Sequence, residues 1–232
     1  MSELSSILIR YRELLSEVDA WFVKCSLVSG DQISCERGCS ACCRGLFDIT
    51  LLDAFMLKDS FDMLPEEIKE AVLKKSRRRI GQIRKIWPDF DDPWLLNRYP
   101  EEDWDKVMPE EDETPCPLLG EDGSCMVYDG RPMTCRLNGI PLVDNSGEVL
   151  FDEWCSLNFT DSHPLEIEGL RFCFNEIFTQ EQLLFREFTR QMFGRPFNEL
   201  DTLIPMAVLI DFGNFRLPDA LVFDSEPVKE SL

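Results

Sequence analysis

Histidine and long apolar runs are the two features that this chain most clearly lacks. Its 232 residues contain a single histidine, His163, which excludes a histidine-rich catalytic zinc site and leaves no Ser-His-Asp or Cys-His pairing to expect. No stretch of about 18 apolar residues is present, so we expect no membrane-spanning helix. No glycine-rich phosphate-binding loop occurs either. These absences leave the cysteines as the main carriers of chemistry.

Positive charge is also scarce. The sequence has 24 Lys and Arg against 44 Asp and Glu, a formal net charge of −20, which argues against a nucleic-acid partner because binding a phosphate backbone needs clustered positive charge. The first residues mix charged and apolar side chains and lack the basic start and apolar core of a secretory signal. We therefore expect a soluble cytoplasmic protein with reduced cysteines, which favours metal binding over disulfides.

Eight of the ten cysteines fall into two groups. The first group spans nine residues and the second follows 73 residues later; the members are Cys35, Cys39, Cys42 and Cys43, then Cys116, Cys125, Cys135 and Cys155. Thiolates bind both zinc and the iron of iron–sulfur clusters, so the sequence predicts a metal site in two halves and leaves the metal open. Eight sulfurs suffice for two four-coordinate sites or for one cluster with spare thiols.

The adjacent pair Cys42 and Cys43 is the unusual part of this pattern. Consecutive Cα atoms lie about 3.8 Å apart and their side chains diverge, so the two thiols are not expected to share one metal comfortably. One of them faces a second ion, bridges two irons or remains a reactive thiol. Cys25 and Cys173 lie outside the groups, among apolar residues, and are expected in the core.

Four arginines are candidates for tuning the site. Arg37, Arg44 and Arg136 each lie within two residues of a cysteine of the two groups, and Arg131 lies four residues before Cys135. Guanidinium donors offset the charge of several thiolates and hydrogen-bond to cluster sulfurs. Ordinary salt bridges in so acidic a protein are the alternative explanation.

Apolar periodicity predicts several helices. Apolar residues recur at three- and four-residue spacing over residues 4–25, and Gly30 is expected to end this helix. A short helix is expected over 49–58 with Asp48 or Thr50 as its cap. Further along the chain we expect helices over 65–87, 165–178, 180–193 and 202–212, and a hairpin formed by 142–143 and 149–151.

Charge is concentrated in two neighbouring segments. Residues 65–85 carry eight Lys and Arg against three Glu, whereas residues 89–113 carry eleven acids against two basic residues. Solvated charged faces are the simplest interpretation, and pairing between the two segments is a second. The charged helix and the acidic loop are also the candidate surfaces for a protein partner.

Taken together, the cysteine motifs resemble those of a known family. The blocks Cys35-x3-Cys39-Ser-Ala-Cys42-Cys43, Cys116-Pro-Leu-Leu, Gly-Ser-Cys125-Met-Val-Tyr and Arg131-Pro-Met-Thr-Cys135-Arg136 follow one another in the order that is typical of the YkgJ-type cysteine-cluster family. The resemblance covers about residues 33–155 and implies chelation of zinc or iron by these seven cysteines. Cys155 matches only as a later cysteine of variable spacing.

The sequence therefore predicts a helix-dominated α+β fold with small hairpins and irregular loops around a cysteine-rich metal site. We expect a metal-binding domain over 1–160, with a charged insertion at about 62–114, and a helical extension over 161–232 that packs on it. The expected function is binding of an iron–sulfur cluster or zinc, with electron transfer or cluster handling as the task. A structural zinc adaptor is the alternative. A radical-type iron–sulfur enzyme ranks lower, because no alternating strand–helix pattern is present.

Overall fold

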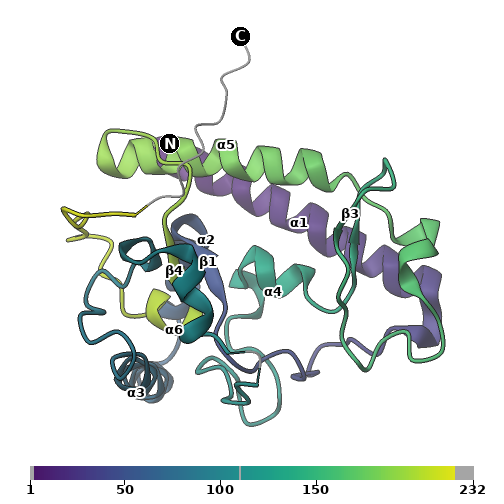
Figure 1. The fold of residues 1–232 in the computed structure, drawn as a ribbon, viewed down its shortest axis with the longest axis horizontal. Helices are drawn as coiled ribbons and strands as arrows, with labels where there is room; N and C mark the ends of the chain where they lie inside the picture. Colours follow the sequence, from purple (N-terminus) through teal and green to yellow (C-terminus); the bar gives the residue numbers. More distant parts are fainter. Residues whose placement is uncertain (1–2, 110, 223–232) are drawn as a thin grey trace.

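Helices dominate the computed structural model, which describes residues 3–109 and 111–222 (Figure 1). The helices are α1 (Glu3–Ser29), α2 (Leu51–Asp62), α3 (Glu66–Ile83), α4 (Met133–Leu137), α5 (Phe174–Phe193) and α6 (Ile204–Ala207). Two small antiparallel sheets pair β1 (Asp48–Thr50) with β4 (Asp201–Leu203) and β2 (Leu142–Val143) with β3 (Val149–Phe151). The predicted helix-dominated α+β fold is thus confirmed.

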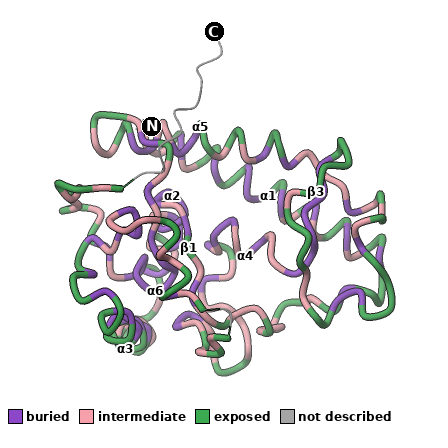
Figure 2. The backbone as a smooth tube through the Cα atoms, in the orientation of Figure 1, coloured by how far each residue is buried: buried purple, intermediate pink, exposed green. Residues whose placement is uncertain are grey.

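The long helices α1 and α5 lie side by side and form one face of the main core (Figure 1). The predicted periodicity of α1 places Tyr11, Trp21 and Cys25 on its buried side, and buried and exposed positions alternate along it in Figure 2. Trp21 donates a hydrogen bond from Nε1 to the Leu170 carbonyl (2.8 Å) and packs against the Phe174 ring (centroids 4.9 Å apart). These contacts tie the start of α5 to the middle of α1. Within the described chain, no helix is long and apolar enough to cross a membrane.

The prediction of two helices over 165–178 and 180–193 is wrong. Residues 164–166 and 168–170 form single 3₁₀ turns, and α5 then runs unbroken through residue 179. The Thr179 hydroxyl donates to the Asn175 carbonyl (2.7 Å) within the helix instead of capping a new one. Helix α5 ends at Gly194, whose φ of 74° is the left-handed conformation that favours glycine at this position.

The sheet formed by β1 and β4 was not predicted. Asp48, Ile49 and Thr50 pair with Leu203, Thr202 and Asp201, so a segment expected to begin a helix at residue 202 is extended. Only α6 remains of the expected helix over 202–212, with Pro205 in its first turn. The sheet fixes the start of α2, where Thr50 caps the helix by accepting a hydrogen bond from the Asp53 amide (3.1 Å), as one of the two predicted caps.

The charged insertion forms a second, smaller core. Helix α3 ends at Ile83, earlier than predicted, and turns lead on to Trp87, whose ring stacks on Tyr99 (centroids 4.0 Å apart, planes 6° apart). Two ion pairs connect the basic helix to the acidic segment, Arg79 with Asp112 and Arg84 with Asp91. Both buried and exposed positions occur along α3 in Figure 2. The pairing between the two charged segments is therefore partial.

Candidate metal centre

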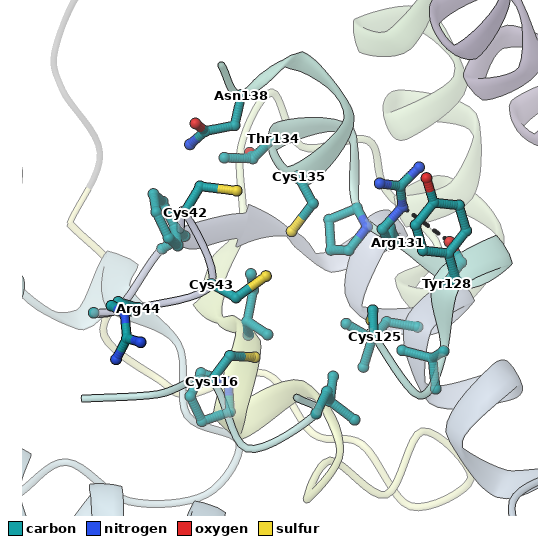
Figure 3. A pocket seen from close by; sticks show the side chains of 18 of the residues that line it. Cys42, Cys43, Arg44, Cys116, Cys125, Tyr128, Arg131, Thr134, Cys135 and Asn138 are labelled. Atoms are coloured by element: carbon teal, nitrogen blue, oxygen red, sulfur yellow. Dashed lines mark hydrogen bonds between the residues drawn. The ribbon is translucent and has the colours of Figure 1, made fainter. Parts of the chain in front are cut away.

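Six cysteines line one cavity of about 90 Å³. They come from the loop before β1, from the turns at 115–128 and from α4, and they are Cys39, Cys42, Cys43, Cys116, Cys125 and Cys135. The sulfurs of Cys43, Cys116 and Cys135 point into the space between these segments (Figure 3). Apolar side chains, among them Leu118 and Val127, complete the wall. The cavity is far below the roughly 300–1,000 Å³ of a site for a drug-sized ligand, so its size suits an ion or a compact cluster.

Backbone pairing brings the two halves of the cysteine pattern together. The amide of Cys116 donates to the carbonyl of Cys43 (2.9 Å), and Leu119 forms a β-bridge with Cys125. Gly123 lies against the first loop, with a φ of 82°, and a Cβ at this position would lie 2.7 Å from the Gly38 carbonyl oxygen. Glycine is required there for both reasons. The 72 residues between Cys43 and Cys116 therefore form one long segment whose two ends lie together.

Cys35 and Cys155 do not line this cavity. Asn158, which is 1% exposed, donates from Nδ2 to the Cys35 sulfur (3.2 Å) and to the Gly139 carbonyl (2.7 Å). Gly139 has a φ of 106°, and a Cβ there would lie 3.1 Å from the Cys35 sulfur and 3.9 Å from the Cys155 Cβ. These two cysteines thus lie close to one another beside Gly139, and neither lines the cavity.

Burial disfavours the thiolate form of several cysteines in the cavity wall. Burial raises the pKa of Cys116 to about 11 and raises the pKa of Cys125 and of Cys135. Within the adjacent pair, the hydrogen bond between the two thiols raises the pKa of Cys42 and lowers that of Cys43. A bound cation would stabilise the thiolates and release their protons. Cys43 is therefore the most readily ionised member of this pair.

The donor chemistry fits a thiolate-bound metal, but the side chains are not positioned as ligands. Within residues 3–109 and 111–222, no group of three or more Cys, His, Asp or Glu side chains is arranged to hold an ion as it stands. His163 lies beside the Trp154 ring (5.6 Å between ring centroids) and does not line the cavity. Metal binding therefore requires the cavity thiols to turn toward a common point.

A buried carboxylate supports the helix that carries Cys135. Asp53 is 2% exposed and accepts the Met133 amide at the start of α4, with both carboxylate oxygens 3.1 Å from the nitrogen. The Tyr11 hydroxyl lies 2.8 Å from Asp53 Oδ1 and 3.1 Å from Glu181 Oε1. Burial raises the pKa of Asp53. Asp53 and Tyr11 were missed from sequence because their partners are distant in the chain.

The four candidate arginines lie in different places. Arg131 and Arg44 line the cavity; Arg131 also stacks on the Tyr128 ring, with its guanidinium carbon 3.6 Å from the centroid. Arg37 covers the same ring at 4.9 Å and does not line the cavity. Arg136 is buried and donates to the carbonyls of Asp129 (2.7 Å) and Arg131 (3.0 Å), as well as to the Asp19 carboxylate. Arg136 thus holds the segment 129–136 to α1. The guanidinium groups of Arg131 and Arg44 form ion pairs with Asp19 and Glu113 (3.5 Å each), as the salt-bridge explanation expects.

A family model covers the segment that builds this cavity. The CxxCxxCC model, a domain to which chelation of zinc or iron is ascribed, matches residues 34–156. This span is more than half of the chain, so the chain belongs to the CxxCxxCC family. In this chain the first interval, between Cys35 and Cys39, is three residues. No curated protein and no solved structure matches the chain.

Proposed function

We propose that this chain is a cytoplasmic iron–sulfur protein that acts in electron transfer or in the handling of iron–sulfur clusters. The observation that carries the proposal is the convergence of six thiols from three separate segments on one small, largely apolar cavity. Family membership supports the coarser statement that the domain chelates zinc or iron.

The irregular spacing of the cavity thiols favours an iron–sulfur cluster over regular tetrahedral zinc sites. Both kinds of site take four cysteine ligands; the cavity offers six sulfurs in one space, two of them from the adjacent pair Cys42–Cys43. Arg131 lines the same cavity, and its positive charge lowers the pKa of Cys42 and of Cys125 against larger raising effects. Charge near a cluster is among the features that set a reduction potential. A bound cluster would supply one-electron redox chemistry.

The chain's own residues then have definite tasks. Cys43, Cys116, Cys125 and Cys135 would provide four sulfurs from all three segments, and the wall around them is largely apolar. A hydrophobic surrounding is one of the features that tune a cluster. The buried carboxylate of Asp53 holds α4, and so Cys135, at a fixed place in the wall.

A structural zinc adaptor is the second candidate. It is favoured by the irregular backbone around the cavity, because residues 33–47 form turns and a single bridge and residues 111–127 form no helix. A metal ion bound by cysteines from both loops would hold these irregular segments in place. The basic segment 65–85 or the acidic segment 89–113 would then bind the partner protein.

Cysteine variants test the ligation. We expect that Cys116→Ser and Cys135→Ser, purified without oxygen, lose most of the bound metal. Cys173→Ser is the matched control, because Cys173 is partly buried at the start of α5 and does not line the cavity; this variant should keep its full metal content. Full metal content in the Cys135→Ser variant would contradict the proposal.

A further inference from the structure

A second concave surface shares a wall with the cysteine cavity. Residues of α3 at positions i, i+3, i+4 and i+7, which lie on one face of a helix, stand opposite residues 114–119 and form a groove of about 380 Å³. The groove is lined by Lys75, Arg78, Arg79, Gln82, Thr114 to Pro117, and Leu119. Cys116 lines both the groove and the cavity. The basic face of α3 therefore lies beside one of the candidate ligands.

The charges of this groove are largely available to a partner. Arg79 is buried and is held by Asp112 and by Gln82 Oε1 (2.6 Å). Lys75 and Arg78 are exposed, and neither makes an ion pair with any described residue. The positive charges of Lys75 and Arg79 are felt at the Cys116 thiol, whose pKa they lower against the larger raising effect of burial. The groove is thus a local positive surface on a chain of net charge −20.

We propose that this groove is the docking surface for the acidic face of a partner protein, which it brings next to Cys116. The proposal rests on the proposed function, since the partner of an electron carrier must approach the metal site closely. At physiological salt, charges farther apart than about 8 Å are largely screened. The local cations therefore decide the interaction with a compact acidic patch, despite the net charge.

An acidic protein fits the groove better than a nucleic acid does. A polyanion carries charge along its whole length, so a strand lying in the short groove would extend onto the acidic surface that surrounds it. The neighbouring segment 89–113 alone contributes eleven acids. A folded acidic partner confines its negative charge to one patch and meets this repulsion only at its edges.

Charge reversal tests the proposal. The test variant is Lys75→Glu/Arg78→Glu, and the control is Lys24→Glu/Arg190→Glu, which changes the net charge by the same amount at exposed positions on α1 and α5, across the molecule from α3 (Figure 1). The probe is an acidic iron–sulfur carrier protein of the ferredoxin class. Its dissociation constant is measured by calorimetric titration at 50 and 200 mM salt. Zero-length carbodiimide cross-linking locates the lysines in contact.

We expect the α3 variant to bind at least tenfold more weakly than wild type and the control to stay within about twofold. Cross-links should map to Lys75 and neighbouring lysines of α3. Equal weakening in both variants, no binding by wild type, or preferential binding of a single-stranded oligonucleotide in the groove would overturn the proposal. Self-association of wild type that the α3 variant abolishes would assign the groove to a second copy instead, and would also overturn it.

Metal analysis of the same samples separates this proposal from the proposed function. Both double variants should retain the metal content and the visible spectrum of wild type. If wild type holds neither iron nor zinc, the proposed function fails whatever the binding result. If the metal is present and the α3 variant binds the probe normally, only the docking surface is wrong.

Discussion

Replacing Tyr11 with phenylalanine tests whether a buried polar network holds the cavity wall in place. The Tyr11 hydroxyl lies within hydrogen-bonding distance of two carboxylates, Asp53 and Glu181, but it has only one proton to donate. One of the two contacts therefore requires a proton on a carboxyl group. Burial raises the pKa of Asp53 and of Glu181, which is consistent with a shared proton.

The expected cost follows from the lost hydrogen bonds. A hydrogen bond to a charged group contributes about 1.5–3 kcal/mol, and a buried acceptor left unpaired costs a similar amount. Asp53 keeps the Met133 amide as a partner in the variant, so we expect Tyr11→Phe to lower the free energy of unfolding by about 2–3 kcal/mol. For a chain of this size the midpoint of thermal unfolding should fall by roughly 4–12 °C.

Urea and thermal unfolding of the metal-free protein give the measurement, and Tyr99→Phe is the matched control. The Tyr99 hydroxyl is buried and has no hydrogen-bond partner among the residues that the structure describes. Its removal breaks no hydrogen bond and takes away a buried unsatisfied group, so stability should stay the same or rise. A Tyr11→Phe protein as stable as wild type, or a Tyr99→Phe protein equally destabilised, would refute the role of the network.

Two further predictions concern pH and the loop contact. Burial raises the folded-state pKa of Asp201 to about 7 and the pKa of Glu181 above its ordinary value. The folded state therefore binds more protons than the unfolded state at intermediate pH. The free energy of unfolding should fall as the pH rises from about 4 to about 8. Urea unfolding at pH 5 and at pH 8 measures the difference in the free energy of unfolding. Glu181→Gln should make this difference smaller. Gly123→Ala should lower stability by about 1–3 kcal/mol and weaken metal retention, because a Cβ would meet Gly38 at a φ of 82°. Gly30→Ala, with a φ of 54° and nothing within 4 Å, isolates the backbone strain; equal losses in the two variants would show that the loop contact contributes nothing.

Local patterns predicted the elements whose cause lies in neighbouring residues. The apolar periodicity of α1, the Thr50 cap of α2 and the hairpin at 142–151 all depend on a few consecutive positions. The pairing of β1 with β4 could not be predicted in this way, because it joins strands about 150 residues apart and overrides the helical pattern at residue 202.

The candidate site was predictable in its donors and not in its arrangement. Spacing predicted eight cysteines as ligands, and six of them line one cavity. It did not indicate that Cys35 and Cys155 lie outside this cavity, beside Gly139 and Asn158. Nor did it indicate the support given by Asp53, because an aspartate in the first turn of a helix is ordinarily explained by the helix dipole. Long-range hydrogen bonds of this kind leave no local pattern in the sequence.

The central claim is that the cavity cysteines hold an iron–sulfur cluster. The most direct test is the iron, zinc and acid-labile sulfide content of anaerobically purified wild-type protein, measured together with its visible spectrum. We predict iron and sulfide together, with visible absorption that fades on reduction. Zinc alone in a colourless protein would contradict it and would favour the structural adaptor.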